Sequence, residues 1–186
     1  NDAIEQFDYV TRLASNYSSG YSFRAESYIG INQFNKAIDD IIRALNIDGN
    51  DKAFNLMFQV ADSSMVELVT KLKVQSIKSP NNDYWPYCLG VVHEHSGAYS
   101  KAIDYYISSM EKDRSPITAN RISNCYSEIG NFTLALEYID EAIVMDSTNY
   151  DFLMAKADLL YESGDVEKAI KELDIYVNHY PEFYGG

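Results

Sequence analysis

The sequence predicts an all-α fold built from repeated helical hairpins, and three observations lead to it. First, a short pattern recurs five times: an alanine, an aliphatic residue, two further residues and a large apolar residue. Its alanines are Ala3, Ala37, Ala102, Ala135 and Ala169. They are 34, 65, 33 and 34 residues apart, so one interval holds two units. Second, turn-forming residues precede the alanines. Third, apolar residues between the turns recur at the helical period.

Turn and loop signals divide each repeat into two helices. Glycines that can end a helix lie five residues before three of the alanines, at Gly97, Gly130 and Gly164. Asn32 is the counterpart before Ala37. Loops with helix breakers follow the second helices, at residues 48–50, Pro116, 146–149 and Pro181. Each repeat is therefore predicted to be a helix, a short turn, a second helix and a loop.

We interpret the chain as one array over residues 1–186. Residues 1–17 are predicted to be the second helix of an incomplete repeat, and 184–186 a short tail. The repeats between them are predicted at 18–51, 52–82, 83–115, 116–149 and 150–183. About eleven helices follow from this division.

The repeat at 52–82 is degenerate because it lacks the turn glycine. Its sequence Ser64-Met65-Val66-Glu67 fits a capping box, with Ser64 as N-cap and Glu67 reaching back to it. We therefore expect the turn near residues 62–64 and the second helix at about 65–78.

A helical hairpin of this length and pattern resembles the tetratricopeptide repeat (TPR) family. The residues that carry the resemblance are the turn glycines, the pattern alanines, small residues of the first helices and the aromatic residues Tyr28 and Tyr126; the small residues are Gly90, Ser123 and Ala157. The resemblance implies a right-handed α-solenoid. Its first helices would line a concave groove that binds a peptide or a helix of a partner protein.

Carried over residue by residue, the resemblance gives a candidate groove. Its residues are Tyr84, Tyr87, Val91, Glu94, His95, Asn120, Asn124, Ser127, Glu128, Asp158, Tyr161 and Glu162. This lining is aromatic and acidic, so the expected ligand is a neutral to basic peptide. Asn120 and Asn124 are one helical turn apart, and such amides can bind the N–H and C=O groups of a peptide backbone.

The family also contains a subgroup that clamps the acidic C-termini of heat-shock chaperones with basic residues and asparagines. Asn124 lies where one such asparagine could. The comparable groove positions hold no basic residue; they are Tyr87, Val91, Met154 and Asp158. An acidic groove repels a carboxylate tail, so we do not expect this activity.

Composition narrows the partners further. Fifteen basic and 28 acidic residues give a net charge of −13, which argues against a nucleic-acid backbone and against an anionic membrane surface. No apolar run is long enough to insert into a membrane. Two cysteines in 186 residues exclude a disulfide scaffold. They favour a reducing compartment, and the cytoplasm is the location we expect.

The sequence contains no convincing catalytic, cofactor or metal motif. It has no phosphate-binding glycine loop, no G-x-S-x-G and no H-E-x-x-H. His93 and His95 point in different directions on a helix, so they cannot chelate one metal together. Cys88 and Cys125 are interpreted as buried small residues. An enzyme that uses Glu94, His95 and Glu128 is the weakest of the three functions considered.

The expected function is therefore a non-enzymatic protein-interaction module. The alternative is a regulatory or scaffolding TPR segment of a larger protein, which packs on its own chain or self-associates. The first repeat begins in the middle of its motif, at Asn1-Asp2-Ala3, and would expose an apolar edge at Ile4, Phe7 and Val10. We expect from this edge that the chain is part of a longer protein.

Overall fold

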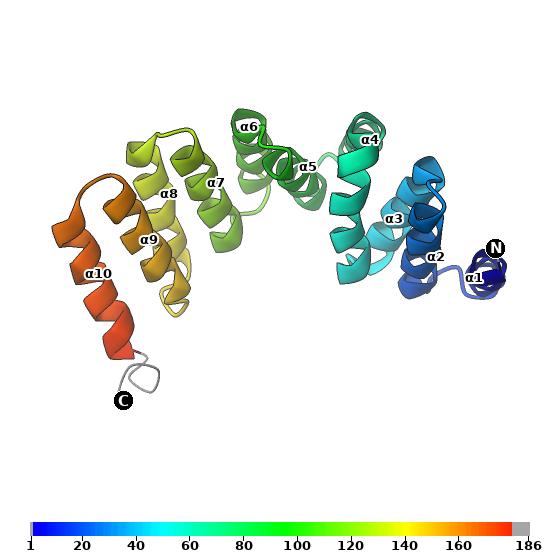
Figure 1. Ribbon diagram of the computed structural model, residues 1–186, viewed down its shortest axis with the longest axis horizontal. Helices are drawn as coiled ribbons and strands as arrows, with labels where there is room; N and C mark the ends of the chain where they lie inside the picture. The colour runs from blue at the N-terminus through cyan, green and yellow to red at the C-terminus, as the bar shows by residue number, and fades with distance from the viewer. Residues whose placement is uncertain (1, 180–186) are drawn as a thin grey trace. The chain divides into compact units, whose positions relative to one another are not determined.

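The computed structural model describes residues 2–179, and all regular elements in that range are α-helices (Figure 1). The predicted all-α fold of TPR-type hairpins is confirmed. The chain divides into two compact units, Asn1–Pro80 and Asn81–Gly186. Unit 1 holds α1 (Asp2–Leu13), α2 (Ser18–Gly30), α3 (Phe34–Asp48) and α4 (Asp51–Lys78). Unit 2 holds α5 (Tyr84–His95), α6 (Tyr99–Met110), α7 (Pro116–Glu128), α8 (Phe132–Met145), α9 (Asp151–Glu162) and α10 (Val166–His179).

The turns inside the hairpins are the ones that the sequence predicts. Asn32, Gly97, Gly130 and Gly164 have φ angles of 58°, 74°, 75° and 92°. This left-handed region is open to glycine and tolerable for asparagine, while other residues are strained there. Each of these residues therefore ends a first helix and lets the chain reverse into the second.

Polar side chains cap the N-termini of several helices. Asn50 accepts a hydrogen bond from the backbone N–H of Ala53 at the start of α4, and Asn131 accepts one from Leu134 at the start of α8. Ser115 caps α7, whose first residue is Pro116. Proline fits this place because the first helical N–H has no partner inside the helix.

The degenerate repeat accounts for the difference between ten helices and the predicted eleven. α4 is continuous from Asp51 to Lys78, but Ser64 inside it has φ −148° and ψ 42°, which are not helical values. The helix is kinked at this residue, inside the region where the sequence predicts a turn. Two helical segments therefore lie on either side of Ser64, joined by a kink instead of a separate turn.

In unit 1, Arg24 of α2 links three helices. Its guanidinium donates to both carboxylate oxygens of Asp40 on α3 at 2.7 and 2.6 Å. It also donates to Asp8 on α1 at 2.5 Å and to Thr11 at 2.9 Å. The hydrogen bond with Asp40 is the main cause that raises the pKa of Arg24. These bonds hold α1 against the α2–α3 hairpin.

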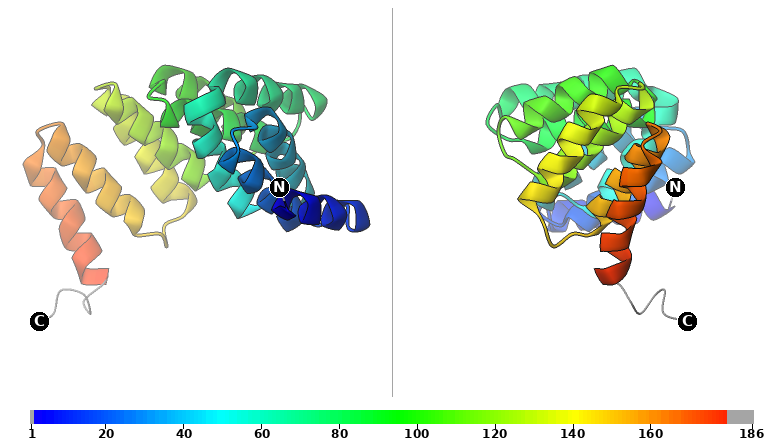
Figure 2. Two further views of the ribbon diagram at one scale, coloured as in Figure 1. Left: turned by 45° about the vertical axis from the view of Figure 1, so that its right-hand side comes forward. Right: turned by 90° about the vertical axis from the view of Figure 1, so that its left-hand side faces the viewer.

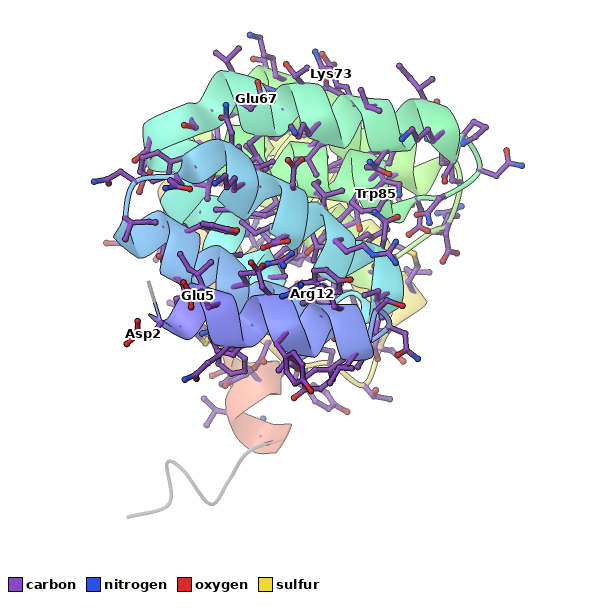
Figure 3. All side chains as sticks on the ribbon, turned by 90° about the vertical axis from the view of Figure 1, so that its right-hand side faces the viewer. Asp2, Glu5, Arg12, Glu67, Lys73 and Trp85 are labelled. Atoms are coloured by element: carbon purple, nitrogen blue, oxygen red, sulfur yellow. The ribbon has the colours of Figure 1, made fainter. Side chains whose placement is uncertain are left out.

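The N-terminal edge differs in detail from the expectation. Phe7 stacks on Phe23 of α2 with ring centroids 5.6 Å apart, and Ile4 and Val10 are also half-buried. The exposed apolar residues of α1 are instead Tyr9 and Leu13. Figure 3 looks onto α1, with Glu5 and Arg12 labelled along it. The predicted edge is therefore covered in part by α2.

Unit 2 consists of three helical hairpins, α5–α6, α7–α8 and α9–α10, with α6 against α7 and α8 against α9. The antiparallel helices α7 to α10 can be followed in both views of Figure 2. Small residues let the two helices of a hairpin approach closely. A Cβ on Gly90 would lie 2.5 Å from the ring of Tyr106, and the buried hydroxyl of Ser123 donates to the carbonyl of Ala135 at 2.7 Å. The exact repeat boundaries stay a prediction.

None of the helices in the described range combines the length and the apolar character that a membrane span needs.

Candidate functional site

All twelve predicted groove residues lie on the first helices of unit 2. α5 carries Tyr84, Tyr87, Val91, Glu94 and His95; α7 carries Asn120, Asn124, Ser127 and Glu128; α9 carries Asp158, Tyr161 and Glu162. Six of them are exposed: His95, Asn124, Glu128, Asp158, Tyr161 and Glu162. Tyr84, Tyr87, Glu94, Asn120 and Ser127 are half-buried.

Arg121 of α7, which the sequence analysis did not select, organises the α5 side of this face. It donates to both carboxylate oxygens of Glu94 at 3.0 and 3.2 Å and to the hydroxyl of Tyr87 at 3.0 Å. Its guanidinium also lies over the Tyr87 ring, 5.7 Å from the centroid. Tyr106 of α6 donates its hydroxyl to the same carboxylate. The Glu94 carboxylate of α5 therefore joins Tyr106 of α6 and Arg121 of α7.

Val91 lies on α5 between the two residues that Arg121 binds. Tyr87 is one turn before it and Glu94 one turn after it on the same face of α5, and Arg121 binds both. Val91 is only 1% exposed, in contrast to Asn124 and Asp158 at the corresponding places of α7 and α9. The expectation that Val91 lines an open groove is not supported by this burial, because the side chain belongs to the core.

Burial and charge shift the pKa values of this network. Burial and the neighbouring Glu94 carboxylate raise the pKa of the Tyr106 hydroxyl far above its usual range. Burial lowers the pKa of Arg121, but Tyr106, Tyr87 and Glu94 raise it by more. Tyr106 is therefore a neutral donor and Arg121 a cation at neutral pH, and the charge of Glu94 is balanced inside the protein.

Asn120 has an acceptor without a donor. Its side-chain oxygen Oδ1 is buried and receives no hydrogen bond from any residue in the described part of the chain. A buried amide oxygen without a partner costs about 1–3 kcal/mol. Asn124, one turn further along α7, is exposed.

The far side of the face is acidic. Ser127 of α7 donates to the carboxylate of Glu162 on α9 at 2.9 Å. The charge of Glu128 raises the pKa of Tyr99 on α6. With Asp158 also exposed, these residues place three carboxylates, Glu128, Asp158 and Glu162, on the exposed part of α7 and α9.

The structure gives little support to the hypothesis of a catalytic site. No group of three or more metal-ligating side chains occurs among the residues from 2 to 179. Glu94, one of the three residues considered for an enzyme, is held by Arg121. Cys88 and Cys125 are buried, and burial raises the pKa of each thiol to about 12, so neither is a thiolate at neutral pH.

Comparison with known proteins agrees with this fold. Residues 126–182 match the family model of the tetratricopeptide repeat. No curated protein matches the sequence. Among solved structures, yeast Tom70 is 17% identical with a TM-score of 0.64; the alignment covers 94% of this chain and 39% of that chain. This chain therefore spans well under half of the Tom70 chain.

Two further structures are similar over most of their length. YrrB, described as a TPR protein with an unusual peptide-binding site, is 18% identical with a TM-score of 0.58, over 96% of this chain and 94% of that chain. A thermophilic TPR protein of Thermus thermophilus is 12% identical with a TM-score of 0.57, over 85% of this chain and 89% of that chain. The resemblance to the TPR family, inferred from the repeat residues, is confirmed at the level of the fold.

Proposed function

We propose that unit 2 binds a peptide or a helix of a partner protein on the face formed by α5, α7 and α9. TPR-type folds serve as protein-interaction scaffolds, and the likeness to a TPR protein with a peptide-binding site supports this use. The observation that carries the proposal is the buried Oδ1 of Asn120, which has no donor among the described residues.

An extended peptide supplies the groups that this oxygen lacks. Rotation of the half-buried Asn120 side chain would bring Oδ1 to a backbone N–H of the ligand, and the exposed amide of Asn124 would bind a second backbone group one turn away. Forming the first bond removes the desolvation penalty of Asn120, so the gain appears only in the complex.

Charge selects the kind of peptide. Residues 81–186 contain 18 acidic and 7 basic residues, which gives a net charge of −11. Arg121, the arginine on the α5–α7 face, is already paired with Glu94. Glu128, Asp158 and Glu162 therefore set the field, and a neutral to basic ligand is attracted. The same field disfavours the acidic chaperone tails that one subgroup of the family binds.

The alternative, self-association through the N-terminal edge, would use the exposed Tyr9 and Leu13 of α1. It is separable from the groove because both residues belong to unit 1.

The test first captures partner proteins from a lysate with the wild-type chain and with Asn120→Leu. The captured proteins are identified, and their binding segments are then measured as synthetic peptides. Asn120→Leu keeps the size of the side chain but removes the acceptor. We expect it to weaken binding about tenfold, as for the loss of one buried hydrogen bond.

Thr133→Ala, at an exposed position of α8, is the control and should bind like the wild type. Equal binding by wild type, Asn120→Leu and Asn124→Ala would contradict the proposal. If instead Tyr9→Asp alone abolished association, the alternative would be favoured.

A further inference from the structure

A stripe of four apolar residues recurs at the same distances from the turn in each second helix. In α3 it is Phe34, Ile38, Ile41 and Leu45; in α6, Tyr99, Ile103, Tyr106 and Met110; in α8, Phe132, Leu136, Ile139 and Ile143; in α10, Val166, Ile170, Leu173 and Val177. Positions i, i+4, i+7 and i+11 lie along one face of a helix.

In α8 this stripe is covered by α9. Ile139 is completely buried in one cluster with Phe152 and Leu159 of α9, and Leu136 and Ile143 pack against the same cluster. The equivalent residues Ile103 and Tyr106 of α6 are also buried. In α8 the stripe therefore contacts the first helix of the following hairpin, while Tyr106 in the stripe of α6 packs on α5 of its own hairpin.

In α10 the same stripe is open. Val166, Ile170, Leu173 and Val177 are 46%, 54%, 39% and 36% exposed. In Figure 1, α10 lies at the end of unit 2, with α9 on one side and no further described helix of unit 2 on the other. Its apolar residues follow the helical spacing and are not scattered, which distinguishes them from ordinary exposed hydrophobic residues.

A charged residue lies beside the stripe in α8 and α10, while the equivalent residues of α3 and α6 are Ile42 and Ile107. Asp140 of α8 forms an ion pair at 2.9 Å with Lys156 of the covering helix α9. The equivalent residue of α10 is Asp174, 34 residues later, which is exposed and makes no ion pair in the described part of the chain. The open stripe of α10 thus retains, in Asp174, the acidic residue that in α8 forms an ion pair with a lysine of the covering helix.

We propose that the Val166–Val177 stripe of α10 is a second docking surface, and that its occupant is an amphipathic, basic helix of another protein. The covering face of α9 defines the pattern of this helix: Phe152, Ala155 and Leu159 pack on α8 and Lys156 pairs with Asp140. The ligand therefore has an apolar residue, a small residue three positions later, a lysine or arginine next to it, and a second apolar residue at position seven.

A second copy of the chain fits this surface less well. In the described residues, the face that covers a second helix is itself buried, with Phe152 and Leu159 of α9 5% and 4% exposed. A second copy could offer such a face only by opening one of its own hairpins. The surface is also separate from the proposed groove, since it lies on a second helix and uses none of the groove residues.

The probe is a labelled peptide with the sequence of residues 149–164, which contains α9, titrated with the chain of residues 1–186 and followed by fluorescence anisotropy. Saturable binding is expected. Leu173→Asp in the protein should weaken it at least about tenfold. Ile175→Asp is the matched control, because Ile175 lies on the same helix, is exposed and points away from the stripe; it should bind like the wild type.

Charge reversal tests the proposed lysine. The peptide with Lys156→Glu should bind about two- to fivefold more weakly to the wild-type chain, and Asp174→Lys in the protein should restore its binding. Absence of saturable binding below about 1 mM peptide would overturn the proposal. Binding that survives Leu173→Asp would also overturn it, because the peptide would then lie elsewhere, for example in place of α9 on α8. So would a dimer in sedimentation experiments that Leu173→Asp abolishes, because a second copy would then occupy the stripe.

Discussion

Arg121 of α7 binds both carboxylate oxygens of Glu94 on α5, at 3.0 and 3.2 Å, one helical turn from the buried Val91. These two charged side chains of the candidate binding face neutralise each other and are part of the folded structure. The net charge on the rest of the face therefore comes from the exposed carboxylates. The following predictions concern this pair, its neighbours and the two proposed surfaces.

Replacement of Arg121 should destabilise the protein. In Arg121→Met the half-buried Glu94 loses its cation, and we expect the free energy of unfolding in urea to fall by about 1–3 kcal/mol, between the values for exposed and for buried pairs. Arg114→Met is the matched control, because Arg114 pairs with Glu141 but is 68% exposed at its side chain. It should cost about 1 kcal/mol or less. Equal losses in both variants would contradict the structural role of Arg121.

Tyr106 should make the protein sensitive to alkaline pH. Its pKa is raised in the folded state, so above about pH 10 the unfolded chain loses this proton while the folded chain keeps it. Stability from this group is full below that pH and is lost as the pH rises, by about 1.4 kcal/mol per pH unit. The unfolding free energy of Tyr106→Phe, measured from pH 8 to 11, should fall less steeply than that of the wild type. Parallel curves would show that Tyr106 is not responsible.

Gly90 should not tolerate a side chain. A Cβ at this position would lie 2.5 Å from the Tyr106 ring, so Gly90→Ala should overpack the α5–α6 hairpin and cost about 1–3 kcal/mol in thermal or urea unfolding. Gly30→Ala is the control, because nothing lies within 4 Å of a Cβ there. It should be neutral or stabilise by up to about 1 kcal/mol through the unfolded state. A stable Gly90→Ala variant would argue against the close approach of the two helices.

Asn120 should lower the stability of the free protein. Asn120→Leu replaces a buried oxygen that has no donor by an apolar group, so it should raise the free energy of unfolding by about 1 kcal/mol. Thr133→Ala, which removes an exposed hydroxyl, should change stability by less than about 0.5 kcal/mol. A clear loss of stability in Asn120→Leu would mean that the amide is part of the scaffold and not kept for a ligand.

The sequence predicted those parts of the fold that depend on local chemistry. Gly97, Gly130 and Gly164 mark the turns because the left-handed conformation requires a residue without a bulky side chain. The sequence predicted the position of the break at Ser64, but as a turn between two helices and not as a kink within α4. Local signals could not show that the two helical segments are joined by a kink instead of a separate turn, since that depends on packing against the rest of unit 1.

The candidate site was predictable only in outline. Counting from the turn glycines gives Val91, Asn124 and Asp158 the same place in their helices, and the sequence analysis therefore treated them alike. It could not show that a long side chain, Arg121, reaches across to Tyr87 and Glu94, or that Val91 between them is buried. The 34-residue distance from Tyr87 to Arg121 is a signal that puts the two on neighbouring first helices, but only side-chain geometry shows that they meet.

The central claim, that the ligand lies on the α5, α7 and α9 face, is tested most directly by site-specific photocrosslinking. A photoreactive amino acid is placed at Asn124 of α7, or at Val144 of α8, which is 83% exposed on a second helix. Our account predicts that position 124 crosslinks to the bound partner peptide, that unlabelled peptide suppresses this product, and that position 144 gives none. Crosslinks from position 144 with none from position 124 would contradict it.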